Sequence, residues 1–262
     1  MNLDLTGKRA MVCGSTRGIG YACAVELATL GAQVTLVARN ERSLAEVRER
    51  LPTPHGQAHE VIVADFETPE TLAWKLREYV ETHPPVHILV NNTGGPPGGP
   101  LAEAPLEALH RAFAMHVLSN QTLVRALVPG MKAEGYGRIV NVISTSVKQP
   151  IPGLGVSNTI RGAVANWAKT LATELGPHGI TVNNVLPGAT ETHRLAALIA
   201  AKAEKTGRPE EAVAEEMRSV IPARRFARAE EIAFAVAFLA SPAAAYVNGV
   251  NLPVDGGRTK CL

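Results

Sequence analysis

The segment Cys13-Gly14-Ser15-Thr16-Arg17-Gly18-Ile19-Gly20 decides how this chain of 262 residues is interpreted. It stands between an apolar run, Arg9–Cys13, and an amphipathic stretch over residues 19–30, so it predicts a turn from a strand into a helix. In its G-x-x-x-G-x-G spacing, glycine permits a tight turn and a close backbone approach, and a helix N-terminus attracts an anion. Glycines also mark plain turns. The strand before and the helix after favour a dinucleotide pyrophosphate site formed by Gly14, Ser15, Arg17, Gly18, Ile19 and Gly20.

Apolar runs and amphipathic stretches alternate through the rest of the chain. The apolar runs are nearly continuous, which is typical of parallel strands buried on both faces. They cover Arg9–Cys13, Gln33–Ala38 and residues 58–63, 87–91, 138–143, 180–186 and 249–253. Helical patterns cover residues 19–30, 41–51, 70–82, 106–132, 157–175 and Ala229–Ala240. This alternation predicts an α/β fold, with a doubly wound (Rossmann) parallel sheet of seven strands.

Nothing in the chain marks a boundary between domains. No linker, repeat or block of charge divides it, so we expect a single domain over residues 1–262. Two loops are long: residues 93–105 are rich in glycine and proline, and residues 187–222 contain a helix of their own. Because long loops in α/β folds usually serve the site, residues 188–222 predict a substrate lid.

Composition excludes several classes of function. The chain has 26 Lys and Arg against 24 Asp and Glu, a net charge of +2, which gives no basic footprint for nucleic acid or an anionic membrane. No apolar run is long enough for a membrane span, and the N-terminus lacks the apolar core of a signal peptide. The three cysteines, Cys13, Cys23 and Cys261, form no C-x-x-C pair. We therefore expect no disulfide, no metal site and a cytoplasmic location.

The end of the second strand indicates which nicotinamide cofactor the glycine loop would take. A site for NAD usually has Asp or Glu there to hold the ribose hydroxyls, but this chain has Ala38 followed by Arg39. The guanidinium fork of Arg39 matches a 2′-phosphate, and Arg17 in the glycine loop can approach the same group. The alternative is that both arginines are solvated surface charges. Two arginines at these positions, with the acid missing, favour NADP(H).

With these motifs the sequence resembles the short-chain dehydrogenase/reductase family along nearly its whole length, and 3-oxoacyl-acyl-carrier-protein reductases most of all. Val63-Ala64-Asp65 resembles the family's adenine-contacting aspartate, and Asn91-Asn92-Thr93-Gly94 its N-N-A-G turn. Pro187-Gly188 with Thr192 resembles the P-G-x-x-x-T segment that lies over the nicotinamide. Val254-Asp255-Gly256-Gly257 resembles the closing V-D-G-G. The resemblance implies cofactor contacts at Asp65, Asn91, Thr93, Gly94, Pro187, Gly188 and Thr192.

The catalytic residues of the family are only partly present. The family uses a Ser, a Tyr-x-x-x-Lys pair and an upstream Asn, and Ser144 after the fifth strand matches the Ser. The Tyr position is Ser157, the Lys position is Arg161, and the Asn position is His116. An aliphatic hydroxyl is a far weaker acid than a phenol, whereas Arg161 keeps a positive charge for the nicotinamide ribose. Ser144, Ser157, Arg161 and His116 are the candidate catalytic set.

His116 is the first candidate to replace the missing acid, because a histidine can titrate near neutral pH. The alternative is a helix histidine that makes a supporting hydrogen bond. His193 and Lys148 lie near the site in the sequence, and we expect both at the surface or in the lid.

Two functions follow from these residues. The first is an NADP(H)-dependent oxidoreductase that transfers hydride between the nicotinamide and a small carbonyl or alcohol substrate, such as a 3-oxoacyl thioester. The second is an NADP(H)-binding protein of the same fold without turnover, a sensor or a partner subunit, which the S-x-x-x-R pattern favours. The resemblance also implies a homotetramer that pairs the helices over residues 106–132 and 157–175 with their symmetry mates. Neither nucleic acid nor membrane is expected as a partner.

Overall fold

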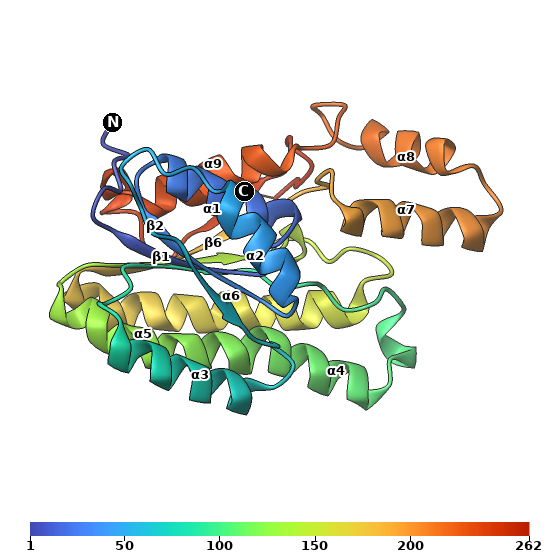
Figure 1. Ribbon diagram of the computed structural model, residues 1–262. Coiled ribbons are helices and arrows are strands. Elements are labelled where there is room, and N and C mark those ends of the chain that lie inside the picture. The colour runs from blue at the N-terminus through green and yellow to red at the C-terminus, as the bar shows by residue number, and fades with distance from the viewer. Residues whose placement is uncertain (262) are drawn as a thin grey trace.

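Seven parallel strands form the centre of the computed structural model, which describes residues 1–261 (Figure 1). Their order in the sheet is β3-β2-β1-β4-β5-β6-β7, and all neighbouring strands are parallel. The predicted doubly wound sheet of seven strands is therefore confirmed. The strands are β1 (Arg9–Cys13), β2 (Gln33–Ala38), β3 (Glu60–Val63), β4 (Ile88–Asn91), β5 (Gly137–Val142), β6 (Ile180–Pro187) and β7 (Asn251–Val254).

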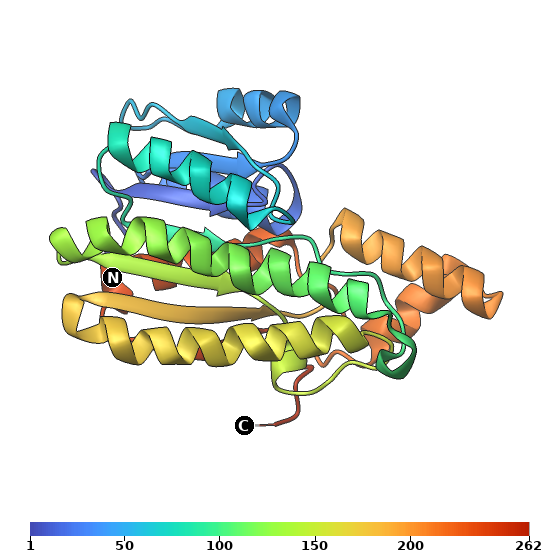
Figure 2. The ribbon, with the colours of Figure 1, turned by 90° about the horizontal axis from the view of Figure 1, so that it is seen from below.

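Helices cover both faces of the sheet (Figures 1 and 2). One face carries α1 (Gly18–Thr29), α2 (Glu41–Arg50) and α9 (Ala229–Ala240). The other carries α3 (Pro69–Thr82), α4 (Leu106–Phe113), α5 (Ser119–Ala133) and α6 (Gly155–Leu175).

The central strand β1 shows why its sequence is continuously apolar. Its side chains alternate, so that Ala10 and Val12 pack in the core under α1 and α9, while Met11 and Cys13 pack in the core under α3, α5 and α6. Both cores therefore contribute to the position of the loop that follows Cys13. Among residues 1–261, no helix is both long and apolar enough to cross a membrane.

The strand order reverses between β1 and β4, which lie side by side in the sheet. The chain leaves β1 toward β2 and β3 on one side, and leaves β4 toward β5, β6 and β7 on the other. In open α/β sheets such a reversal opens a crevice at the carboxyl ends of the strands, where ligands bind. The glycine loop follows β1 and the Asn92-Thr93-Gly94 turn follows β4, so both lie at this crevice.

Two helical segments differ from the prediction. The helix expected over residues 106–132 is divided into α4 and α5 by a π-turn, Ala114–Leu118, which the hydrophobic pattern does not reveal. The long loop after β6 contains two helices rather than one, α7 (His193–Thr206) and α8 (Glu210–Ser219), which project from the body of the molecule (Figure 1). Gly207, with φ of +65°, ends α7, and Pro209 precedes α8.

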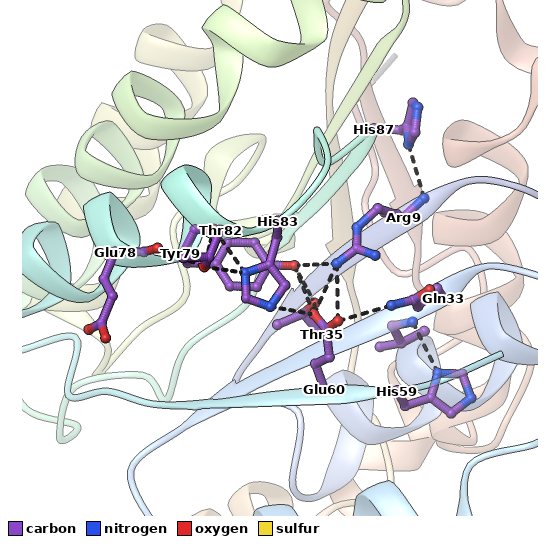
Figure 3. A network of polar contacts seen from close by, with 11 residues as sticks. Arg9, Gln33, Thr35, His59, Glu60, Glu78, Tyr79, Thr82, His83 and His87 are labelled. Atoms are coloured by element: carbon purple, nitrogen blue, oxygen red, sulfur yellow. Dashed lines mark hydrogen bonds and ion pairs between the residues drawn. The ribbon is translucent and has the colours of Figure 1, made fainter.

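A polar network lies at the opposite, amino edge of the sheet (Figure 3). Arg9 Nη2 donates to Glu60 Oε2 at 3.0 Å and to the Tyr79 hydroxyl at 3.0 Å. The Tyr79 hydroxyl lies 2.8 Å from Thr35 Oγ1, and His83 stacks on the Tyr79 ring. These contacts join residues of β1, β2 and β3 to α3. The network is remote from the crevice and holds the sheet edge in register.

Candidate active site

The glycine loop after β1 needs glycine at three positions. Gly14 and Gly18 have φ of +58° and +56°, a region that disfavours side chains. A Cβ on Gly14 would lie 2.5 Å from the carbonyl oxygen of Asn92, and one on Gly20 would lie 2.1 Å from the carbonyl oxygen of Gly14. The loop therefore folds back on itself and against the end of β4, with no space for a methyl group.

Asn92 fixes this loop to β4, and the sequence analysis assigned it no role. Its Nδ2 lies 3.3 Å from the carbonyl oxygens of both Cys13 and Gly14, to which it donates. The two consecutive asparagines at the end of β4 were the sequence feature that could have indicated this role. Its neighbour Asn91 is 3% exposed and donates to Asn141 Oδ1 at 2.8 Å inside the sheet. Asn91 thus directs its amide across to the neighbouring strand β5, and its contact with a cofactor stays a prediction.

The glycine loop ends at a helix N-terminus that has free donors. The first N–H groups of a helix have no partner within the helix, and the residue before α1, Arg17, is extended and provides no side-chain cap. Among residues 1–261, Arg17 makes no ion pair either. Ser15 is buried, and its hydroxyl donates to the carbonyl oxygen of Val37 at 3.4 Å. The backbone at this point therefore fits a pyrophosphate, and the glycines leave space for it.

Arg39 lies at the carboxyl end of β2, opposite Asp65 after β3. Arg39 Nη1 is 3.8 Å from Asp65 Oδ2, and the two side chains are 64% and 41% exposed. Asp65 also accepts a hydrogen bond from the backbone N–H of Glu67 at 2.9 Å, which orients its carboxylate. Such an exposed pair contributes little to stability. It places a cation and an anion where the resemblance puts the adenosine ribose and the adenine.

His116 lies in the π-turn between α4 and α5 and is 2% exposed. Its Nδ1 is 2.6 Å from the hydroxyl of Thr93, whereas its Nε2 is buried and has no hydrogen-bond partner among residues 1–261. Burial lowers the pKa of His116 well below its usual range. The charge of Arg161 lowers the pKa further, while the backbone of Gly94 acts in the opposite direction. The expectation that His116 titrates near neutral pH is therefore wrong, because a proton here would have neither solvent nor, within residues 1–261, a counter-ion.

Arg161 is 8% exposed and extends from α6 to the end of β5. Its Nη1 donates to the carbonyl oxygen of Val142 at 3.1 Å, two residues before Ser144. Burial, together with the nearby charge of Arg194, lowers the pKa of Arg161 to about 10, so Arg161 stays charged at neutral pH. Ser157 lies one turn earlier on the same face of α6. Ser144 Oγ accepts from the backbone N–H of Ser146 at 3.1 Å, so its own proton is free to donate.

Arg194, the second residue of α7, joins this group, and the sequence analysis missed it. Its Nη2 donates to the carbonyl oxygen of Pro96 at 2.6 Å, across to the proline-rich loop after β4. A Cβ placed on Gly95 would lie 3.6 Å from Arg194 Nη2 and 3.9 Å from Arg161 Nη2. The position of Arg194 directly after Thr192 and His193 in the sequence could have indicated that it lies near the site. His193 itself is exposed, as expected, and so is Lys148.

The segments after β6 and β7 lie beside the glycine loop at the crevice. Thr192 accepts from the backbone N–H of Leu195 at 3.4 Å and so caps α7, and its Cγ2 would lie 3.2 Å from a Cβ on Gly18. The backbone N–H of Gly188 donates to the carbonyl oxygen of Val254 at 2.9 Å. A Cβ on Gly188 would lie 2.7 Å from Asp255 Cα. The structure thus brings the P-G-x-x-x-T and V-D-G-G motifs together beside the glycine loop.

Fold and site together define a dinucleotide-binding α/β protein, and comparison with known proteins identifies the family. The family described as "Enoyl-(Acyl carrier protein) reductase" matches residues 14–259. The chain therefore belongs to this family, within the short-chain dehydrogenase/reductases.

Relatives match the whole chain. The chain is 34% identical to 2,3-dihydroxy-2,3-dihydro-p-cumate dehydrogenase of Pseudomonas putida, over 98% of this chain and 96% of that protein. It is also 34% identical to a 3-oxoacyl-[acyl-carrier-protein] reductase of Pseudomonas aeruginosa, over 97% and 98%. The structure is similar to that of L-sorbose reductase from Gluconobacter frateurii complexed with NADPH and L-sorbose, with a TM-score of 0.93, 32% identity and full coverage of both chains. The expected resemblance is confirmed.

Proposed function

We propose that this protein is an NADP(H)-dependent oxidoreductase that interconverts a carbonyl and an alcohol on a small molecule. One observation carries the proposal: in a member of this family, a loop with no space for a Cβ at Gly14 or Gly20 leads into an uncapped helix N-terminus. The similar L-sorbose reductase binds NADPH, and the relatives are dehydrogenases and reductases.

The preference for NADP(H) over NAD(H) rests on Arg39 and Arg17. Both side chains are exposed beside the crevice, and the position where NAD sites have an acid is Ala38. Asp65 is 3.8 Å from Arg39 and leaves part of its guanidinium fork free, because a distant carboxylate uses few of the five N–H donors. That fork would hold the 2′-phosphate, with Arg17 as a second cation.

The cofactor, when bound, supplies the hydride. The Ser144 hydroxyl would donate to the substrate carbonyl oxygen, and Arg161 would stabilise the negative charge that develops there. The lowered pKa of His116 keeps its imidazole neutral, and in the tautomer in which the Thr93 hydroxyl donates to Nδ1, Nε2 would carry the proton and act as a third donor. These three groups hold the oxyanion, and water supplies the proton that the missing phenol would give.

The test begins with binding of NADPH, followed by fluorescence, against NADH as a matched control. A panel of ketones and 3-oxoacyl thioesters is then added, and NADPH oxidation is followed by absorbance. We expect tight NADPH binding and turnover of at least one ketone class. Binding without turnover on the whole panel contradicts the proposed activity, and absence of NADPH binding contradicts the cofactor as well.

A homotetramer is part of the proposal. Leu106, Phe113 and Leu118 are 73%, 42% and 44% exposed along α4 and the π-turn, where the resemblance expects one subunit contact. Exposed apolar side chains of this kind favour a symmetric helix pair. Light scattering at micromolar concentration should give four times the chain mass of 27.7 kDa, and a monomer would refute the assembly.

The location in the cell is proposed to be the cytoplasm. Cys13 and Cys23 are buried and Cys261 is exposed, and all three are free thiols, which suits a reducing compartment. Fractionation of cells that produce the protein would test this, and recovery outside the cytoplasm would contradict it.

A further inference from the structure

Two arginines meet at the substrate side of the crevice without an acid between them. Arg161 and Arg194 come from α6 and α7, and each guanidinium would lie within 4 Å of a Cβ on Gly95. Among residues 1–261, neither forms an ion pair with a carboxylate, although other arginines of the lid, such as Arg208 and Arg218, do. The hydrogen bonds of Arg161 and Arg194 to carbonyl oxygens use few of their five N–H donors.

A buried cation without a counter-ion is costly. Arg161 is 8% exposed, and the neighbouring charge of Arg194 adds repulsion to the cost of burial. Charged groups perturbed in this way cluster at functional sites, where a ligand can supply the missing negative charge. The third group at this point is His116, which is 2% exposed and whose Nε2 has no hydrogen-bond partner among residues 1–261. A buried polar atom of this kind is normally satisfied, so it too indicates a missing ligand atom.

We infer that Arg161, Arg194 and Gly95 form a binding site for an anionic oxygen group of the substrate, a carboxylate or a phosphate, held beside the reacting carbon. This inference rests on the proposed oxidoreductase function. Guanidinium forks bind carboxylate and phosphate oxygens in pairs, and glycine at position 95 leaves the space between them open. Arg194 also bonds to Pro96, so the group would be enclosed between the lid and the proline-rich loop.

The phosphates of the cofactor are the competing source of negative charge. The glycine loop, the N-terminus of α1 and Arg39 are already placed for those phosphates. Arg161 lies instead at Val142, next to Ser144, where the resemblance puts the nicotinamide end. The pair is therefore assigned to the substrate.

The experiment titrates oxalate and, separately, inorganic phosphate into the protein saturated with NADPH, and measures heat of binding. Arg194→Gln is the main variant because Arg194 is exposed and its loss should leave the fold intact. Gly95→Ala keeps both arginines and fills the space between them, at ordinary contact distances of 3.6 and 3.9 Å. Arg208→Gln, on the lid but paired with Glu216, is the matched control.

We expect one of the two anions to bind at least tenfold more weakly to Arg194→Gln, and to be weakened in Gly95→Ala, with no change in Arg208→Gln. Preference for oxalate assigns a carboxylate substrate, and preference for phosphate assigns a phosphate ester. Binding of neither anion, or equal binding to Arg194→Gln, overturns the inference. So does an equal loss of NADPH affinity in Arg194→Gln, because the pair would then serve the cofactor. Failure of the wild type to bind NADPH would instead refute the proposed function.

Discussion

His116 makes the stability of this protein sensitive to mild acid. Burial and the charge of Arg161 lower its folded pKa well below its usual range, whereas the unfolded chain takes up the proton near pH 6.5. Because the unfolded state binds more protons below that pH, the free energy of unfolding falls as the pH falls toward the folded pKa. Above about pH 7.5 both states are neutral at this residue, and it contributes no pH dependence.

The size of the effect follows from this linkage. If the folded imidazole stays neutral, moving from about pH 7.5 to about pH 5.5 costs about 1.4 kcal/mol for this one residue. His116→Asn removes the titrating group and can keep a hydrogen bond to Thr93. The difference in stability between variant and wild type should therefore shift by about 1.4 kcal/mol in favour of the variant over that range.

Urea denaturation at a fixed protein concentration, at several pH values, measures this difference. The exposed His178 gives the matched control, His178→Asn, which makes the same substitution at the surface and leaves the buried imidazole in place. His87 also has a lowered pKa, through burial and the charge of Lys8, so the His116→Asn protein should retain part of the acid sensitivity. A pH-independent difference between His116→Asn and wild type would refute the reasoning, because His116 would then be protonated equally in both states.

Three further predictions concern the cofactor crevice and the sheet beneath it. Arg39→Ala should weaken NADPH binding at least tenfold and leave NADH binding unchanged, since one charged hydrogen-bonding group is lost; equal affinities for NADPH before and after would remove Arg39 from the site. Gly20→Ala should abolish binding of both cofactors in fluorescence titrations, because its Cβ would lie 2.1 Å from the Gly14 carbonyl oxygen; retained binding would show that the loop can open. Asn141 is 0% exposed and is hydrogen-bonded to the amides of Asn91 and Asn184. Asn141→Leu leaves both amides without this partner, so the free energy of unfolding should fall by about 2–4 kcal/mol in thermal unfolding, and an unchanged melting temperature would contradict this.

The fold was predictable because its signals are local. The apolar runs of β1 and β2 are bounded by polar residues or glycine, and the predicted bounds agree with the structure. The π-turn was not predictable, because one extra residue in a helical turn does not change which residues between Leu106 and Ala133 are apolar. Gly207 and Pro209 do mark the break between α7 and α8, and that signal was available and unused.

The parts of the site that lie in sequence motifs were predictable. The parts that depend on contacts between residues far apart in the sequence were not. The glycine loop could be located from its spacing alone. The lack of an ion pair at Arg161 among the described residues, and the approach of Arg194 to the Pro96 loop, depend on where α7 lies in space. The same holds for the low pKa of His116, which results from burial and from a charge on another helix.

The last prediction concerns the S-x-x-x-R pattern itself. Replacing Ser157 by Tyr and Arg161 by Lys restores the pair that the family uses. A tuned general acid is worth about 10²–10⁴ in rate, so reduction of neutral ketones by the double variant should rise by a factor of that order. Affinity for oxalate should fall in the same protein, since a Lys cannot replace the guanidinium fork that holds Val142 and faces Gly95.

The control for this exchange is Ser157→Phe with Arg161→Lys, which adds the ring without the hydroxyl. If the gain comes from the phenol as an acid, the control should show no gain on neutral ketones, and the gain in the Tyr variant should fall as the pH rises through the pKa of the phenol, because reduction needs its protonated form. An equal gain in both variants would mean that the ring acts by excluding water. No gain in either, with NADPH still bound, would mean that the end of β5 and α6 no longer hold substrate where a phenol can reach it. Arg161 and Ser144 would then belong to a substrate site arranged differently from that of the family. The S-x-x-x-R pattern would reflect a changed function rather than a lost one.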